Sequence, residues 1–143
     1  MPHLVILYTP QLDAQTDMTA LCRTLADTMV AARDEAGQPV FPTGGVRVLA
    51  YPAAHSAVAD GGSAGRAAGG SGDYGFVYLN LRMARGRSPA TQQAVGRALE
   101  ADVKRHFEAL LAARHLGITL QVDEGTEVFD AKNSSLHPLF AKP

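Results

Sequence analysis

The sequence predicts one α+β domain, a two-layer sandwich in which two helices cover one face of a four-stranded sheet. Two stretches carry an apolar residue every three or four positions, as amphipathic helices do. Each of them lies between two short apolar stretches that are typical of strands. The element order is therefore β-α-β, a loop, and β-α-β. Such crossovers predict parallel strands within each half of the chain.

The size and composition fit a single globular domain over residues 1–143. The chain is 46% hydrophobic and 19% charged, within the range of ordinary globular proteins. Its 13 basic and 14 acidic residues give a net charge of -1, which argues against a broad surface for nucleic acid. The single cysteine and the lack of a signal peptide or membrane-spanning stretch predict a cytoplasmic location.

The first half is predicted as a strand, a helix and a second strand. Residues 4–8 form an apolar run that begins the sheet. Asp17 is placed to cap the first helix, which we expect to extend to about Ala36, with Gly37 as its C-terminal stop. The second strand is expected at residues 46–51.

The second half is predicted to repeat this order. Residues 74–83 are almost continuously apolar, which favours a central position in the sheet. Ser88 is expected to cap the second helix, with Pro89 in its first turn and its end near residues 116–117. Alternating residues at 118–122 predict the fourth strand.

A segment rich in glycine, alanine and serine, about residues 57–72, separates the two halves. It shows no periodicity and has little to bury, so the sequence predicts a flexible loop. Either it serves as a lid over a site or it is a tolerated insertion. The strands themselves are too apolar for a solvated face, and the tail after the fourth strand is apolar as well. Both features favour burial in an oligomer.

The N-terminus predicts a reactive amine. Pro2 follows the initiator and precedes an apolar strand, so removal of Met1 would leave a secondary amine at the mouth of the sheet. Burial favours the neutral form of an amine, and a neutral amine near pH 7 can act as a general base. The alternative is a proline with no role beyond beginning a strand.

Arginines gather at two places in the sequence. Arg47 interrupts the second strand, and Arg82, Arg85 and Arg87 surround the turn before the second helix. Cations at a helix N-terminus are unfavourable for stability, and arginine binds carboxylates through two parallel hydrogen bonds. The pattern therefore indicates a carboxylate or phosphate receptor, with surface arginines paired to acidic residues as the alternative.

Other kinds of site are not predicted. The five histidines lack the spacing of a metal site, and no phosphate-binding glycine motif or nucleophile elbow is present.

Several stretches together carry a family resemblance. They are Pro2-His3, the strand at residues 74–83, Gly86-Arg87-Ser88, Lys104-Arg105-His106-Phe107, and Leu136-His137-Pro138-Leu139-Phe140 within residues 133–140. In these stretches the chain resembles the 5-carboxymethyl-2-hydroxymuconate Δ-isomerase family of the tautomerase superfamily.

The resemblance implies a tautomerase-like β-α-β-β-α-β fold, a homotrimer and a cofactor-independent isomerase of homoprotocatechuate breakdown. Such an enzyme converts a dienol carboxylate into its conjugated ketone. The resemblance implies Pro2 as the general base, Arg87 as a substrate-binding arginine and Arg47 as a second one. It implies no metal and no organic cofactor.

The chain departs from the family pattern in two ways. Leu49 stands where typical members have a second basic residue, and the loop after the second strand is longer and richer in glycine. We expect both differences to touch the substrate pocket, which leaves the identity of the acid open. Decarboxylation, hydrolytic dehalogenation and a non-catalytic trimeric binding protein on the same fold are the alternatives.

Overall fold

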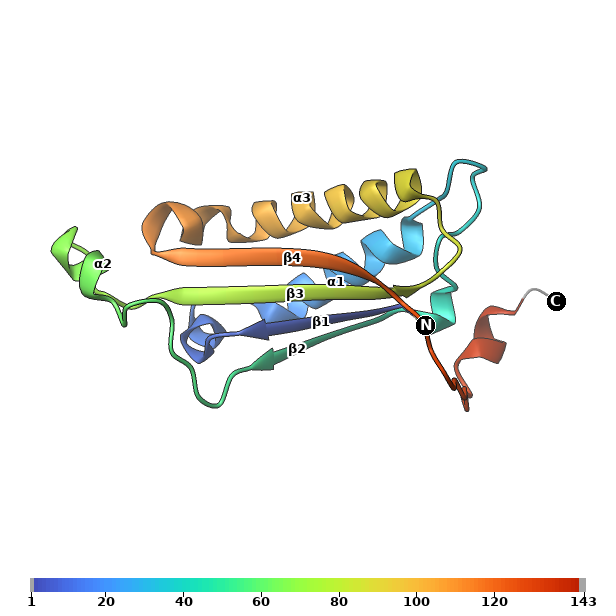
Figure 1. Cartoon of the computed structure of the whole chain (residues 1–143), viewed down its shortest axis with the longest axis horizontal. Coiled ribbons are helices and arrows are strands. Elements are labelled where there is room, and N and C mark those ends of the chain that lie inside the picture. Colours follow the sequence, from blue (N-terminus) through green and yellow to red (C-terminus); the bar gives the residue numbers. More distant parts are fainter. Residues whose placement is uncertain (1, 142–143) are drawn as a thin grey trace.

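A computed structural model describes residues 2–141, and its centre is one four-stranded sheet (Figure 1). The strands are β1 (His3–Tyr8), β2 (Arg47–Pro52), β3 (Gly75–Ala84) and β4 (Leu116–Gly125), in the spatial order β2-β1-β3-β4. The pairs β1–β2 and β3–β4 are parallel, whereas β1 and β3 are antiparallel. The predicted parallel halves and the central position of the long third strand are both confirmed.

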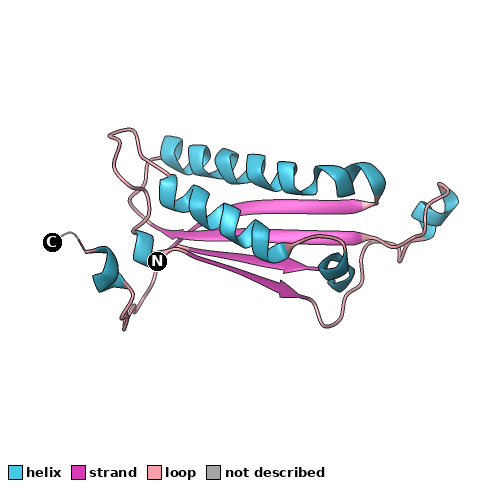
Figure 2. Ribbon diagram, turned by 180° about the vertical axis from the view of Figure 1, so that it is seen from behind, coloured by secondary structure: helices cyan, strands magenta, loops and turns pink. Residues whose placement is uncertain are grey.

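Two long helices, α1 (Met18–Ala31) and α3 (Pro89–Ala113), lie side by side on one face of the sheet (Figure 2). The two-layer α+β prediction is therefore confirmed. The core lies between these layers because alternate strand residues point toward the helices. Its strand members include Leu4, Ile6, Val77, Leu79 and Leu81, and its helix members include Leu21, Leu25, Leu99 and Phe107.

Both helices begin where the sequence predicts. The Asp17 carboxylate accepts a hydrogen bond of 2.9 Å from the backbone N–H of Ala20. Ser88 Oγ accepts one of 3.1 Å from the N–H of Thr91, and Pro89 occupies the first turn of α3. These caps satisfy backbone donors that have no partner within the helix.

The first helix is shorter than predicted. It ends at Ala31 and not near Ala36, because a turn centred on Asp34 competes with further helix. The Asp34 carboxylate accepts the backbone N–H groups of Ala36 and Gln38 at 2.9 and 2.8 Å. Gly37 has a φ of 76° and serves this turn, so the prediction that it stops the helix was wrong.

Residues 57–72 are not irregular throughout, as the flexible-loop prediction assumed. A short helix, α2 (Ser63–Ala67), follows Asp60, whose carboxylate accepts backbone N–H groups at the start of α2. The Tyr74 hydroxyl accepts the N–H of Gly65 at 2.8 Å. Figure 1 shows α2 at the end of the molecule opposite the N-terminus. Within one chain, this segment is therefore no lid over Pro2, and its extra length does not touch the pocket there.

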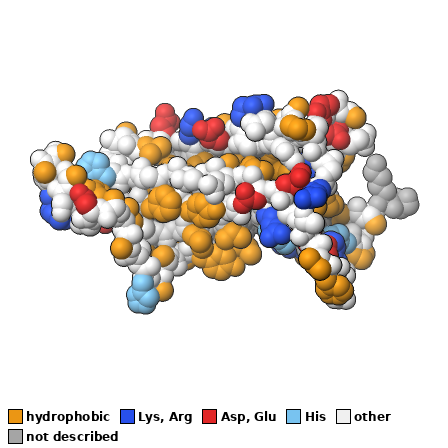
Figure 3. Space-filling view, in the orientation of Figure 1, with side chains coloured by type: hydrophobic (Ala, Val, Ile, Leu, Met, Phe, Trp, Pro, Cys, Tyr) orange, Lys and Arg blue, Asp and Glu red, His pale blue; other side chains and the backbone are white. Residues whose placement is uncertain are grey.

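The face of the sheet away from the helices is open and largely apolar near β1 and β2 (Figure 3). Leu7, Leu49 and Tyr51 are 46–49% exposed there, and Phe76 on β3 is 36% exposed. The tail beyond β4 also exposes apolar side chains, among them Val128 and Phe129. Its last described turn, η3 (His137–Phe140), packs against η2 (Thr43–Gly45) at the N-terminal end of β1.

Candidate active site

Pro2 lies in a closely packed position just before β1. It is buried, and its ring lies over the bare backbone of Gly45 in η2. A Cβ added to Gly45 would lie 3.6 Å from Cδ of Pro2 and 3.1 Å from Cγ of Pro42. Met1, whose removal would expose the Pro2 amine, lies outside the described residues.

His137 reaches the same place from the other end of the chain. Its Nε2 would lie 3.8 Å from a Cβ at Gly45, the point that Pro2 also contacts. Its backbone lies over Gly44, where an added Cβ would be 3.2 Å from the His137 Cα. In the sequence, this histidine belongs to one of the resembling stretches, and no role was predicted for it. Gly45 and His137 lie about ninety positions apart in the sequence, so no local sequence pattern could predict that η3 packs against η2.

Arg47 lies beside the N-terminal end of β1. In the strand register, His3 pairs with Arg47 on one side and with Arg82 on the other. Burial lowers the pKa of His3, and the positive charges of Arg47 and Arg82 act in the same direction. The Asp130 carboxylate acts in the opposite direction on the pKa of His3, so two arginines and one carboxylate lie near this end of the open sheet face. Nη1 of Arg47 also donates to the carbonyls of Gly44 and Val46, both at 2.8 Å.

Arg87 uses more of its guanidinium in backbone contacts than Arg47 does, because Nε, Nη1 and Nη2 all donate. In the described part of the chain, its guanidinium hydrogen-bonds to backbone carbonyls alone. Nη2 donates to the Val40 oxygen at 2.8 Å, and Nη1 donates to the Ala84 oxygen at 2.8 Å. The guanidinium carbon also lies 5.4 Å from the ring centroid of Phe41. Arg87 thus supports the segment that leads into η2, on which Pro2 rests.

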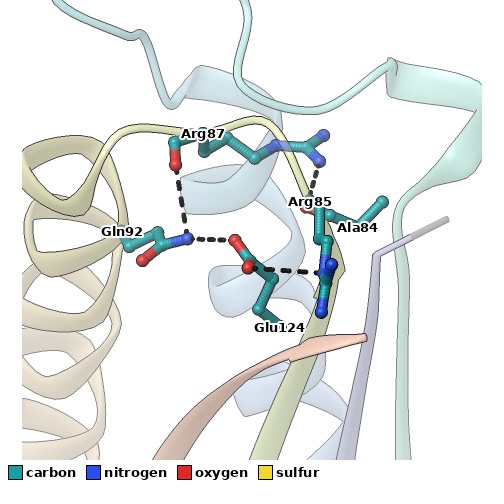
Figure 4. Close-up of polar contacts among 5 residues, drawn as sticks. All are labelled: Ala84, Arg85, Arg87, Gln92 and Glu124. Atoms are coloured by element: carbon teal, nitrogen blue, oxygen red, sulfur yellow. Dashed lines mark hydrogen bonds and ion pairs between the residues drawn. The ribbon is translucent and has the colours of Figure 1, made fainter. Parts of the chain in front are cut away.

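The arginines around this turn do not form one receptor. Arg82 lies on the open face, with its guanidinium close to Gly125. Figure 4 shows Arg85 directed toward Glu124, with Arg85 Nε 3.9 Å from a carboxylate oxygen. Nε2 of Gln92 donates to the same carboxylate at 2.7 Å. For Arg85, the alternative of a surface arginine paired to an acidic residue is the one that the structure shows.

A cavity of about 630 Å³ runs between α3 and β4, lined by residues such as Leu120, Val122 and Lys104. Pro2 does not line this cavity, so the cavity is not the place of the proton transfer predicted for Pro2. In residues 2–141, no three His, Cys, Asp or Glu side chains are grouped to hold a metal ion. Over the same range, no helix combines the length and apolar character needed to span a membrane.

Comparison with known proteins connects this geometry to a family. The model of the 5-carboxymethyl-2-hydroxymuconate isomerase family matches residues 2–140. The 5-carboxymethyl-2-hydroxymuconate Delta-isomerase of Escherichia coli is 26% identical over 140 residues, covering 98% of this chain and 99% of the relative.

Solved structures give the same result. A crystal structure of a 5-carboxymethyl-2-hydroxymuconate delta-isomerase is 58% identical with a TM-score of 0.96, covering 100% of this chain and 95% of that one. A 5-carboxymethyl-2-hydroxymuconate isomerase from Deinococcus radiodurans R1 is 29% identical with a TM-score of 0.81, covering 99% and 95%. A fused 4-OT protein, 18% identical with a TM-score of 0.54 and covering 96% of this chain and 98% of that one, shares the tautomerase fold. The family resemblance is confirmed: the chain is an isomerase that belongs to the 5-carboxymethyl-2-hydroxymuconate isomerase family.

Proposed function

We propose that the chain isomerises 5-carboxymethyl-2-hydroxymuconate, or a closely related dienol carboxylate, without a cofactor and with Pro2 as the general base. The family match supports the substrate class. The observation that carries the mechanism is the position of Pro2, which is buried at the end of the sheet where the next residue, His3, pairs with Arg47. Burial and nearby positive charge both favour the neutral amine that can accept a proton.

The reaction is a balanced proton transfer. The Pro2 amine takes the proton of the dienol hydroxyl, so the O–H bond breaks and a C=O bond forms. The electron pairs move along the conjugated chain, and a distant carbon takes a proton from the ammonium of Pro2. A new C–H bond replaces the O–H bond, one C=C bond changes place, and the base is restored.

Arg47 is the proposed substrate-side cation. It pairs with His3, the residue after Pro2, on the neighbouring strand and carries the fixed positive charge that a carboxylate requires. The predicted carboxylate contact of Arg87 is a weaker part of the proposal, because its Nε, Nη1 and Nη2 all donate to backbone carbonyls, whereas Arg47 uses only Nη1 in this way. We assign Arg87 to the support of the segment that leads into η2.

The proposal includes a homotrimer in the cytoplasm. The fused 4-OT neighbour was solved as an asymmetric trimer, and the open apolar face of this sheet offers a surface for a second copy. The proposed partners are a small carboxylate and further copies of the chain.

A chemical block of the Pro2 amine tests the function. Intact-mass measurement should show that Met1 is absent from an active preparation. One added residue before Pro2 turns the amine into an amide, and turnover of 5-carboxymethyl-2-hydroxymuconate should be lost while the far-ultraviolet dichroism stays unchanged. Pro2→Ala, which keeps a primary amine, should retain a small part of the activity. Wild-type turnover by an extension variant of verified mass would refute Pro2 as the base.

A further inference from the structure

We propose that His137 is a substrate-contacting residue of the Pro2 site, carried there by the C-terminal turn η3, and that it binds a carboxylate or enol oxygen. The inference rests on the proposed function and extends it to a residue at the other end of the chain. It depends on the close packing of η3 against η2.

The side chain of His137 runs along η2 toward Pro2. Its Cα and backbone nitrogen would lie 3.2 and 3.5 Å from a Cβ at Gly44. Its Nε2, at the other end of the imidazole, would lie 3.8 Å from a Cβ at Gly45. Since Cδ of Pro2 lies 3.6 Å from that second point, the imidazole and the proline ring flank one glycine.

Two adjacent glycines make this approach possible. Gly44 and Gly45 are buried, and neither has a positive φ, so space and not backbone conformation is what requires glycine there. A side chain at Gly44 would also meet Cδ2 of Phe140 at 3.1 Å. The bare backbone of η2 therefore leaves room for both the C-terminal turn and Pro2.

The imidazole is the part of the tail that turns inward. Every other residue of the tail from 131 to 141 is exposed, whereas His137 is half-buried. Ser134 Oγ accepts the backbone N–H groups of Leu136 and His137, at 3.1 and 3.3 Å, which fixes the beginning of the turn.

The ring nitrogens of His137 are available to a ligand. Within residues 2–141, they hydrogen-bond to no protein atom, whereas the guanidinium of Arg87 donates to two backbone carbonyls. A neutral imidazole offers one donor and one acceptor, and a protonated one offers two donors. His137 can therefore bind a carboxylate or an enol oxygen held close to Pro2.

Steady-state kinetics with 5-carboxymethyl-2-hydroxymuconate test the assignment. For His137→Ala we expect KM to rise at least tenfold, with a smaller change in kcat and an unchanged thermal unfolding midpoint. His137→Gln places an amide nitrogen near the position of Nε2 and should recover part of the loss. The control is His55→Gln, because His55 is exposed in the segment that leads to α2, far from the N-terminus in Figure 1. Wild-type KM in His137→Ala, on a substrate that wild type isomerises, would overturn the assignment.

A binding measurement separates this inference from the proposed function. Tricarballylate, a saturated tricarboxylate that cannot isomerise, is titrated into the wild-type protein while the histidine ring resonances are followed by NMR. The His137 signal, identified by its absence in His137→Gln, should shift on saturation, and the His55 signal should not. If wild type does not isomerise the dienol, the proposed function fails, yet a shift of the His137 signal with an unmoved His55 signal still supports the contact. An unmoved His137 signal at saturating tricarballylate would overturn it.

Discussion

The contacts of Arg87 predict that it stabilises the fold more than it binds substrate. Arg87→Ala removes two hydrogen bonds of 2.8 Å, one to the Val40 carbonyl and one to the Ala84 carbonyl. It also removes a weaker bond of 3.3 Å from Nε to the Val40 oxygen and the packing on Phe41. The carbonyls of Val40 and Ala84 would lose these donors in a partly buried position.

The magnitude follows from these contacts. A hydrogen bond from a charged donor contributes about 1.5–3 kcal/mol. Stacking of a cation on an aromatic ring adds about 0.5–1 kcal/mol at a partly exposed position. Because Arg87 is itself only half-buried and such contributions do not add fully, we expect the free energy of unfolding to fall by roughly 2–4 kcal/mol. For a chain of this length, that corresponds to a fall of roughly 5–15 °C in Tm.

Urea unfolding and thermal scans at one fixed protein concentration measure this effect, since assembly would make both depend on concentration. Arg97→Ala, on the exposed side of α3, is the matched control and should leave Tm unchanged. Arg87→Lys keeps the positive charge but lacks the planar set of N–H donors, so its Tm should fall less than that of Arg87→Ala. A wild-type Tm in Arg87→Ala, together with a fall of more than tenfold in kcat/KM, would refute the role of Arg87 in stability. That result would restore Arg87 as the ligand of a substrate carboxylate.

Two further predictions concern acid stability and assembly. Hydrogen bonds from Ser88 and Thr91 lower the pKa of Glu35 to about 2 from an ordinary value of 4.5. The contribution of these bonds to the free energy of unfolding is therefore complete above pH 4.5 and is lost as the pH falls toward 2. Unfolding midpoints in urea between pH 2 and 6 should therefore depend less on pH in Glu35→Gln than in wild type, and equal slopes would contradict the link. Light scattering should give a trimer for wild type and a smaller mass for Leu7→Lys, which places a charge on the open apolar face. A wild-type monomer at micromolar concentration would exclude the assembly.

Local signals in the sequence predicted the elements and most of their beginnings. Asp17 and Ser88 cap helices through their own side chains, so their types and positions suffice to locate them. The strands followed from apolar runs, and the order of elements then set the parallel pairs. The end of α1 was predicted wrongly, because the carboxylate of Asp34 forms a turn that the spacing of apolar residues does not indicate.

Contacts between distant residues were beyond such signals. The partner of Arg87 is a backbone carbonyl at Val40, and every residue type carries a carbonyl, so the sequence contains no mark of it. The helix α2 was missed because Tyr74, outside the glycine-rich segment, orders it through a hydrogen bond to Gly65. Arg47 pairs with His3, the residue after Pro2, because β1 and β2 pair in register, whereas Arg87 donates to the carbonyls of Val40 and Ala84.

The placement of α2 has a practical consequence for handling this protein. Pro2 and the C-terminal turn η3 lie at one end of the molecule, so an affinity tag at either terminus is joined to the chain close to the amine and the imidazole. Gly69, beyond α2 at the opposite end, is exposed, and no atom lies within 4 Å of the position that a Cβ would take. A tag, a fluorescent dye or a surface anchor inserted at Gly69 would leave the native N-terminus available for assay.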